Sequence, residues 1–168
     1  MNRKLLFLVA TLSTAAAHAA PPEQALSAAA EDFIRAGAKT ALGACDIIAR
    51  KCGEESFQTL EKGFGESNEE RRNWRKMQLR SLSLTALYPL QDPTRFYIET
   101  LKIDGAGWPI PHGLAIGMPQ EDVSKRLGPP NRKDGKCEVY FSDTQIASAM
   151  LCFQSRRLSS ISWEYFID

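Results

Sequence analysis

The chain has 168 residues, of which 43% are hydrophobic and 24% carry a charge, with 21 basic against 20 acidic side chains. This composition indicates a globular protein with one domain of ordinary size. The formal net charge of +1 gives no general attraction to polyanions, so nucleic acid is not expected as a partner.

Residues 1–19 have the pattern of a cleavable secretory signal peptide. A basic start at Arg3 and Lys4 precedes an apolar run over 5–12, and Ala17-His18-Ala19 is a small-x-small cleavage site. Cleavage removes two of the 21 basic residues and leaves 19 against 20 acidic ones. The sequence therefore predicts an exported protein of the periplasm, with secretion from the cell as the alternative.

Membrane attachment is not expected for the rest of the chain. No later stretch reaches the roughly 18 to 20 apolar residues of a transmembrane helix. The first cysteine, Cys45, lies far from the cleavage site, so the mature N-terminus has no thiol for a lipid anchor.

The region 20–92 is predicted to be helical. Apolar residues recur at three- and four-residue steps from residue 23 to about residue 50, which indicates an amphipathic helix. A short amphipathic helix is expected over 56–64. Another is expected to begin at residue 67 or 68, where a capping side chain precedes two glutamates, and to continue to Pro89.

The region 93–168 is predicted to be a separate sheet domain. Four segments have the composition or the alternation of strands, namely 96–103, 137–142, 148–154 and 158–167. Short turns connect the strands, so the sheet should be antiparallel. The predicted fold class is α+β, with a helical N-terminal half packed against a small antiparallel sheet of about four strands and one short helix.

That short helix is predicted from "GMPQEDVSKRLGPP", residues 117–130. Pro119 suits the first helical position, and acidic residues at the start with basic residues near the end complement the helix dipole. Val123 and Leu127 form one buried face. Gly128 is the expected left-handed cap before two prolines that end the helix. The glycine spacing is wrong for a phosphate-binding loop, so we interpret this stretch as architecture.

Four cysteines in an exported chain indicate disulfides, and three pairings are open. Cys137 and Cys152 are symmetric about a turn predicted at 144–145, where a hairpin would place them opposite each other. Cys45 and Cys52 are seven residues apart, which is about 10 Å on an unbroken helix and too far for a bridge. We favour a helix break near residue 49 that lets them pair; without it they do not pair with each other.

The segment from about 110 to 168 resembles the repeat unit of the SmpA/OmlA outer-membrane-assembly lipoproteins and the β-lactamase-inhibitor-protein-like superfamily. Matching positions are Gly117, Met118, Glu121, Val123, Leu127, Gly128, Pro130, Ile161 and Trp163. The resemblance covers about a third of the chain and implies an inhibitor-like fold that serves unrelated proteins as a binding scaffold. The chain departs from the lipoproteins in its missing lipidated cysteine and its long N-terminal half.

His112 in "PIPHGLAIG" is the strongest catalytic candidate, because a histidine with a serine or a carboxylate can act as a general base. It is the one histidine outside the predicted signal peptide, and we favour the alternative that it is an ordinary loop residue. The sequence has no Gly-x-Ser-x-Gly elbow, and its cysteines lack the paired spacing of zinc ligands. We therefore expect no enzyme, no catalytic residue, no metal site and no cofactor.

Five residues are candidates for contact with a partner. Arg72, Lys76 and Arg80 would form one basic row at four-residue steps on the predicted helix, with a solvated surface as the alternative. Trp108 lies with His112 in a loop rich in glycine and proline, where an aromatic side chain suits an interface anchor. Packing of this loop under the sheet is the alternative for Trp108.

These features favour a non-catalytic, protein-binding module of the bacterial cell envelope. The partner would be a periplasmic or envelope protein, and the resemblance admits an inhibitor or immunity protein that blocks an enzyme as well as an assembly accessory. Binding would use the outer face of the sheet or the loops around Trp108 and His112. The alternatives are a periplasmic enzyme that acts on envelope polymers with His112, and a carrier that holds a lipid or another small ligand in an apolar cavity.

Overall fold

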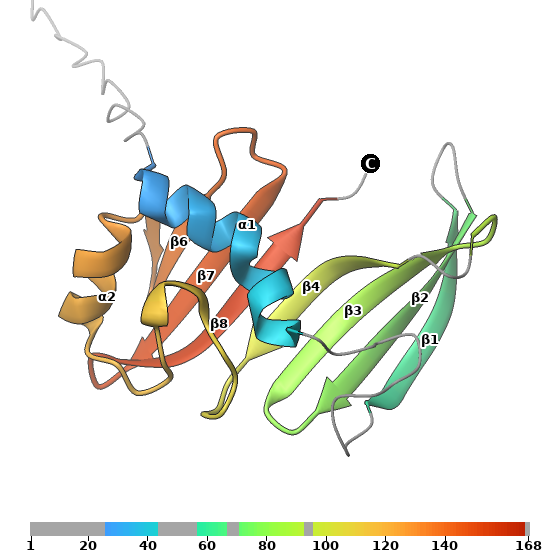
Figure 1. Ribbon diagram of the computed structural model, residues 1–168, viewed down its shortest axis with the longest axis horizontal. Helices are drawn as coiled ribbons and strands as arrows, with labels where there is room; N and C mark the ends of the chain where they lie inside the picture. Colours follow the sequence, from blue (N-terminus) through green and yellow to red (C-terminus); the bar gives the residue numbers. More distant parts are fainter. Residues whose placement is uncertain (1–25, 44–56, 67–70, 93–95, 167–168) are drawn as a thin grey trace, which may run out of the picture.

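The computed structural model describes residues 26–43, 57–66, 71–92 and 96–166. These residues form one antiparallel sheet of eight strands in the order β1-β2-β3-β4-β8-β7-β6-β5. A long helix, α1, packs on β6, β7 and β8, and a short helix, α2, lies beside it (Figure 1). The strands are β1 (Gln58–Glu66), β2 (Arg71–Leu79), β3 (Leu82–Pro89), β4 (Tyr97–Ile103), β5 (Arg132–Asp134), β6 (Cys137–Phe141), β7 (Ala147–Gln154) and β8 (Arg157–Tyr165).

The predicted helical N-terminal half is wrong, because most of it belongs to the sheet. The segments expected as helices over 56–64 and 67–89 contain β1, β2 and β3. In β3 every second side chain is buried on one face, which is the period of a strand; these side chains are Leu82, Leu84, Ala86 and Tyr88. The region is therefore built from antiparallel strands, and the sheet has eight of them instead of about four.

A helical repeat fits the β2–β3 segment by coincidence. Met77 of β2 lies opposite Leu84 of β3, and the chain turns between them at Arg80 and Ser81. Because this short turn returns the chain to the same face of the sheet, buried residues recur seven positions apart, as they do on a helix. Arg80 has a φ of 52°, a backbone conformation that usually calls for glycine.

The strands predicted in the second half are confirmed as β4, β6, β7 and β8. The sheet also contains β5, a strand of three residues at one edge, whose side chains are all exposed. β4 pairs with β3 on one side and with β8 on the other, so strands from both predicted regions join in one sheet. The predicted boundary at residue 92 falls between β3 and β4, which are adjacent strands.

The first helix is shorter than the sequence indicates, since α1 spans Ala28–Leu42. Ser27 caps its start, where the hydroxyl oxygen accepts a hydrogen bond from the Ala30 amide at 3.1 Å. The end is set by Gly43, whose φ of 56° leaves the helical region while its amide bonds the Lys39 carbonyl. A glycine with positive φ is a common helix stop, which accounts for the end of α1 at this point; residues 44–56 lie outside the described residues.

The helix approaches the sheet most closely at Gly37 and Trp163. Trp163 of β8 is fully buried, and a Cβ at position 37 would overlap its indole ring. The indole Nε1 donates a hydrogen bond to the Phe33 carbonyl at 3.3 Å, and the two rings are 5.3 Å apart between centroids. Glycine is therefore required at this position for the backbone of α1 to lie against the indole.

Tyr165 of β8 binds the next turn of the same helix. Its hydroxyl donates a hydrogen bond to the Ile34 carbonyl and accepts one from the Ala38 amide, each at 3.0 Å. Ile34 and Ala38 are four residues apart, and an α-helix joins such a pair directly. The hydroxyl thus bridges one turn of α1 and fixes the helix along β8.

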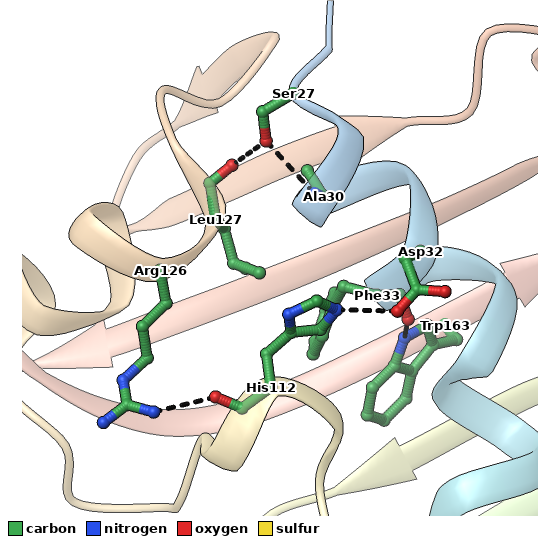
Figure 2. A network of polar contacts seen from close by, with 8 residues as sticks. All are labelled: Ser27, Ala30, Asp32, Phe33, His112, Arg126, Leu127 and Trp163. Atoms are coloured by element: carbon green, nitrogen blue, oxygen red, sulfur yellow. Dashed lines mark hydrogen bonds and ion pairs between the residues drawn. The ribbon is translucent and has the colours of Figure 1, made fainter.

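The predicted short helix is confirmed as α2, which spans Gln120–Leu127. Pro119 occupies the position before the helix and is not its first helical residue. Val123 and Leu127 are fully buried, as the spacing predicts. Gly128 follows with a φ of 80°. The Leu127 carbonyl accepts a hydrogen bond from the Ser27 hydroxyl (Figure 2), so one serine caps α1 and ties it to the end of α2.

The predicted hairpin disulfide is confirmed. Cys137 of β6 pairs in register with Cys152 of β7, and the two sulfur atoms form a bond. The hairpin turns between Ser142 and Ala147, where Gln145 has a φ of 55°. Cys45, Cys52 and the predicted signal peptide lie outside the described residues.

Gly37→Ala should lower the free energy of unfolding by about 1 to 3 kcal/mol, the usual cost of overpacking a core. The loss is expected although alanine is the better helix former by about 1 kcal/mol, because the new methyl group displaces Trp163. Urea unfolding followed by tryptophan fluorescence measures the change. Lys39→Ala, at an exposed position of the same helix, should stay within about 0.5 kcal/mol; a Gly37→Ala protein as stable as the wild type would contradict the close contact.

Cys137→Ser should lower the free energy of unfolding by about 3 kcal/mol, the loop-closure value for a bridge across about 15 residues. The two cysteines are 15 residues apart. Cys152→Ser and the double substitution should have the same effect as the single one, since each removes the same bond. Alkylation of the native protein without reductant should find no thiol at either position, and two reactive thiols there would contradict the register of the hairpin.

Candidate functional site

The two faces of the sheet differ in what covers them. One face, here called the helix face, carries Trp163 and Tyr165 and packs against α1 (Figure 1). The opposite face, here called the open face, consists of the alternate positions of the strands. Neither helix covers it, since α1 and the buried residues of α2, Val123 and Leu127, pack into the core on the helix face.

The pairing of neighbouring strands defines a row of open-face residues that runs from one edge of the sheet to the other. It takes one residue from each strand, in the order Gln58, Gln78, Ser83, Lys102, Ser162, Met150, Val139 and Arg132. In a neighbouring row, Thr85 of β3 and Thr100 of β4 bond each other through their hydroxyls at 3.0 Å. The middle of the open face therefore consists of short polar side chains together with Lys102, which is ion-paired with Asp104.

An aromatic cluster occupies the β2–β4 end of the open face. Trp74 lies in register between Gly63 of β1 and Leu87 of β3, and Leu87 lies beside Tyr97 of β4. A Cβ at position 63 would overlap the Trp74 indole, so the ring lies against the backbone of β1. Nζ of Lys76 is 5.6 Å from the centre of this ring, within cation–π range. The helical interpretation of this region missed the cluster.

A second apolar group occupies the β6–β7 end of the open face. Val139 is only 2% exposed and yet lies outside the hydrophobic core cluster, because it points away from the helices. It pairs with Met150 of β7 and with Arg132 of β5. The Arg132 guanidinium lies 5.5 Å from the centre of the Phe141 ring. Both ends of the open face thus combine large apolar side chains with a cation.

The residues of the predicted basic row lie on a strand and its turn, and not on a helix. Lys76 lies on the open face and is ion-paired with Glu61 of β1, with 2.8 Å between Nζ and Oε2. Arg72 is four residues before Lys76 on β2, so the two positions belong to the same face of the strand. Arg80 is in the β2–β3 turn. The three positions therefore do not make one continuous row of the kind that a helix would present.

His112 is held between the two helices in the 3-10 turn η1 (Pro111–Gly113). Its Nε2 lies 3.0 Å from Oδ2 of Asp32 in α1, and its carbonyl accepts a hydrogen bond from Nη1 of Arg126 in α2 at 2.8 Å (Figure 2). Its φ of 57° is unusual for a residue with a side chain. Within the described ranges no hydroxyl or thiol is bonded to the ring. The contacts attach the β4–α2 connection to both helices.

Trp108 lies in the same connection and is half-buried against the hydrophobic core. The core lies on the helix face, so Trp108 and His112 are on the side of the sheet that α1 occupies. Neither residue contributes to the open face. The two surfaces considered from the sequence, the outer face of the sheet and the loop around Trp108, are thus separate surfaces of the molecule.

A buried polar cluster lies under α2. The Glu138 carboxylate, in β6, accepts a hydrogen bond from Nε2 of Gln120 at 2.7 Å, and its second oxygen lies 3.4 Å from the Tyr140 hydroxyl. Burial, and then the neighbouring Glu138 carboxylate, raise the pKa of Tyr140 well above its ordinary value. Burial also raises the pKa of Tyr165, although the hydrogen bond from the Ala38 amide lowers it in part. Both tyrosines are therefore held as neutral hydroxyls.

No cluster of three or more histidine, cysteine, aspartate or glutamate side chains that could hold a metal ion occurs in the described part of the chain. No helix in that part is long and apolar enough to cross a membrane. Compared with known proteins, the chain matches no family model, no curated protein and no solved structure. The function is therefore argued from the geometry of the surfaces described above.

The folded protein should lose stability above about pH 10, the ordinary pKa of tyrosine. The folded state raises the pKa of Tyr140 and of Tyr165, so it holds these two protons more tightly than the unfolded chain does. The resulting stabilisation is fully present below pH 10 and is lost as the pH rises toward the folded-state pKa values. Thermal melting between pH 8 and 12 should show the decline, and Tyr140→Phe or Tyr165→Phe should flatten it. If the melting temperature of both variants falls with pH as steeply as that of the wild type, the loss of stability does not come from these two tyrosines.

Proposed function

We propose that the protein is an exported, non-catalytic binding module whose open face binds a protein partner of the cell envelope. The observation that carries this proposal is the open face itself. It extends across eight strands, neither helix covers it, and apolar side chains lie at both of its ends. A role as inhibitor, immunity protein or assembly accessory is compatible with such a surface.

The composition of the open face supports a protein partner. An antiparallel sheet with one solvated face usually alternates apolar and polar residues strictly. Here Trp74, Tyr97, Phe141 and Met150 lie at open-face positions, and Tyr97 is 40% exposed. Aromatic residues and methionine are enriched in protein interfaces and often contribute most of the binding energy. The short polar residues between the two ends would lie under the middle of the partner.

Export is supported by two features of different kinds. Residues 1–19 have the sequence pattern of a signal peptide, and Cys137 is bonded to Cys152. Disulfides persist in oxidising compartments such as the periplasm. A periplasmic location, with the partner in the same compartment, agrees with both.

The geometry favours the binding module over the two alternatives. The His112 ring is hydrogen-bonded to Asp32, and its carbonyl accepts a hydrogen bond from Arg126. These contacts explain His112 as a structural residue that attaches the loop to both helices. A carrier would need an apolar cavity between α1 and the sheet. Fully buried side chains of Trp163, Phe33 and Ile34 fill that layer.

A photo-crosslinking amino acid at Gln78, an exposed position on the open face, should yield one discrete protein adduct in a periplasmic extract. Ser162→Tyr in the same protein should reduce the adduct at least tenfold, because a bulky side chain in the middle row separates the surfaces. Ser162 lies on the open face two strands from Ser83 and next to Lys102. Mass spectrometry of the adduct and its yield are the measurements.

Lys39→Tyr is the matched control, since it places the same side chain at an exposed position of α1. It should leave the adduct unchanged. An adduct of equal yield from a crosslinker at position 39, with none from position 78, would contradict the open face as the binding surface. A hydrolytic activity toward envelope polymers that is lost in a folded His112→Asn protein would favour the enzyme instead.

A further inference from the structure

A cavity of about 420 Å³ lies where two hairpin turns meet the start of α2. Its wall includes residues of β5, β6 and the turn between them, of β7 and the β7–β8 turn, and of α2, among them Gln120, Lys133, Lys136, Glu138, Phe153 and Arg156. This volume lies within the range of small-molecule sites. The cavity does not include the aromatic cluster or the middle row of the open face, so the proposed protein-binding function does not account for it.

Backbone contacts hold the two turns and the helix together around the cavity. The Phe153 amide donates a hydrogen bond to the Lys136 carbonyl, and the Gln120 amide donates one to the Arg156 carbonyl, each at 2.9 Å. Ser155 and Arg156 have φ values of 50° and 60°, although neither is a glycine. Positive φ at both residues is the usual geometry of a two-residue hairpin turn of type I′. The side chain of Arg156 is therefore placed by a rigid turn.

Three cations surround the cavity without a negative partner. Lys133, Lys136 and Arg156 are exposed, and within the described ranges none of them is ion-paired. The cavity also contains one carboxylate, that of Glu138, which lies opposite Lys133 in the register of β5 and β6. Three cations against one carboxylate leave the cavity with a net positive charge that attracts an anion.

Glu138 provides the opposite charge inside the same cavity. It is only 3% exposed, and its hydrogen bonds are a neutral amide at 2.7 Å and a hydroxyl at 3.4 Å. No cation of the described residues lies within ion-pair distance of it. A buried carboxylate is unfavourable unless it is paired or fully hydrogen-bonded. Each carboxylate oxygen of Glu138 accepts one hydrogen bond and can accept another, so a donor group of a ligand can bind there.

We propose that this cavity binds a small molecule that carries a phosphate group and, a few bonds away, an ammonium or hydroxyl donor. The phosphate would be held by Lys133, Lys136 and Arg156, since a guanidinium and lysines are the usual partners of a phosphate group. The donor would bind the Glu138 carboxylate. The same chemistry occurs in free phosphorylated amino alcohols and in the headgroup of phosphatidylethanolamine, so both sources are compatible with the site.

Isothermal titration with O-phosphoethanolamine tests the site directly. It should bind at one site per chain and at least tenfold more tightly than inorganic phosphate, which lacks the donor. Vesicle sedimentation distinguishes the sources. Binding to phosphatidylethanolamine vesicles, but not to phosphatidylcholine vesicles, identifies a lipid headgroup, because choline has no N–H donor. Binding of free O-phosphoethanolamine without vesicle binding identifies a soluble ligand.

Three variants show which groups carry the binding. Arg156→Gln should weaken O-phosphoethanolamine and inorganic phosphate alike, by about tenfold. Glu138→Gln should remove the preference for O-phosphoethanolamine over phosphate, and its melting temperature reports whether it folds. Lys62→Gln, which removes an exposed cation of β1 outside the cavity, should change nothing. No saturable binding of O-phosphoethanolamine, or binding that Arg156→Gln leaves unchanged, would overturn the proposal while leaving the protein-binding function of the open face untouched.

Discussion

The contact between Gly37 and the Trp163 indole determines how the rest of the molecule is arranged. Because no side chain separates α1 from β8 at this point, the helix lies low enough for Phe33 and Ile34 to bond β8 through their carbonyls. That position in turn brings Asp32 to His112. The loop and α2 are therefore attached to the same side of the sheet as α1. Neither helix lies on the other face, which leaves that face of the sheet for the binding proposed above.

An element of this fold can be predicted from the sequence when the residues that define it lie close together in the chain. α2 is predicted well because a proline, charged ends and a glycine act within a few residues of one another. The Cys137–Cys152 hairpin is predicted for the same reason, since the symmetry about its turn is local. The β2–β3 segment is predicted wrongly because a two-residue turn preserves a helical repeat. The alternation of Leu82, Leu84 and Ala86 was the signal that favours a strand.

The candidate site depends on contacts that no local pattern contains. The aromatic cluster exists because β1, β2, β3 and β4 pair in one register, which places Trp74 over Gly63 and beside Leu87. The attachment of His112 depends on Asp32, 80 residues away. A weak local signal exists for the polar cavity, since Glu138 interrupts the apolar strand that follows Cys137 and is buried there. A charged residue at a buried strand position is a reason to look for its partners.

The long sequence separation between α1 and β8 determines the order in which the protein can fold. Trp163 and Phe33 are 130 residues apart, and Tyr165 and Ile34 are 131 apart. Contacts over such separations form slowly, because a long loop must close before they contribute. The neighbouring strands of the sheet can pair as local hairpins much earlier. The apolar stripe of α1 must therefore wait for the last strand to be synthesised, and a chain interrupted before β8 would contain hairpins without a closed core.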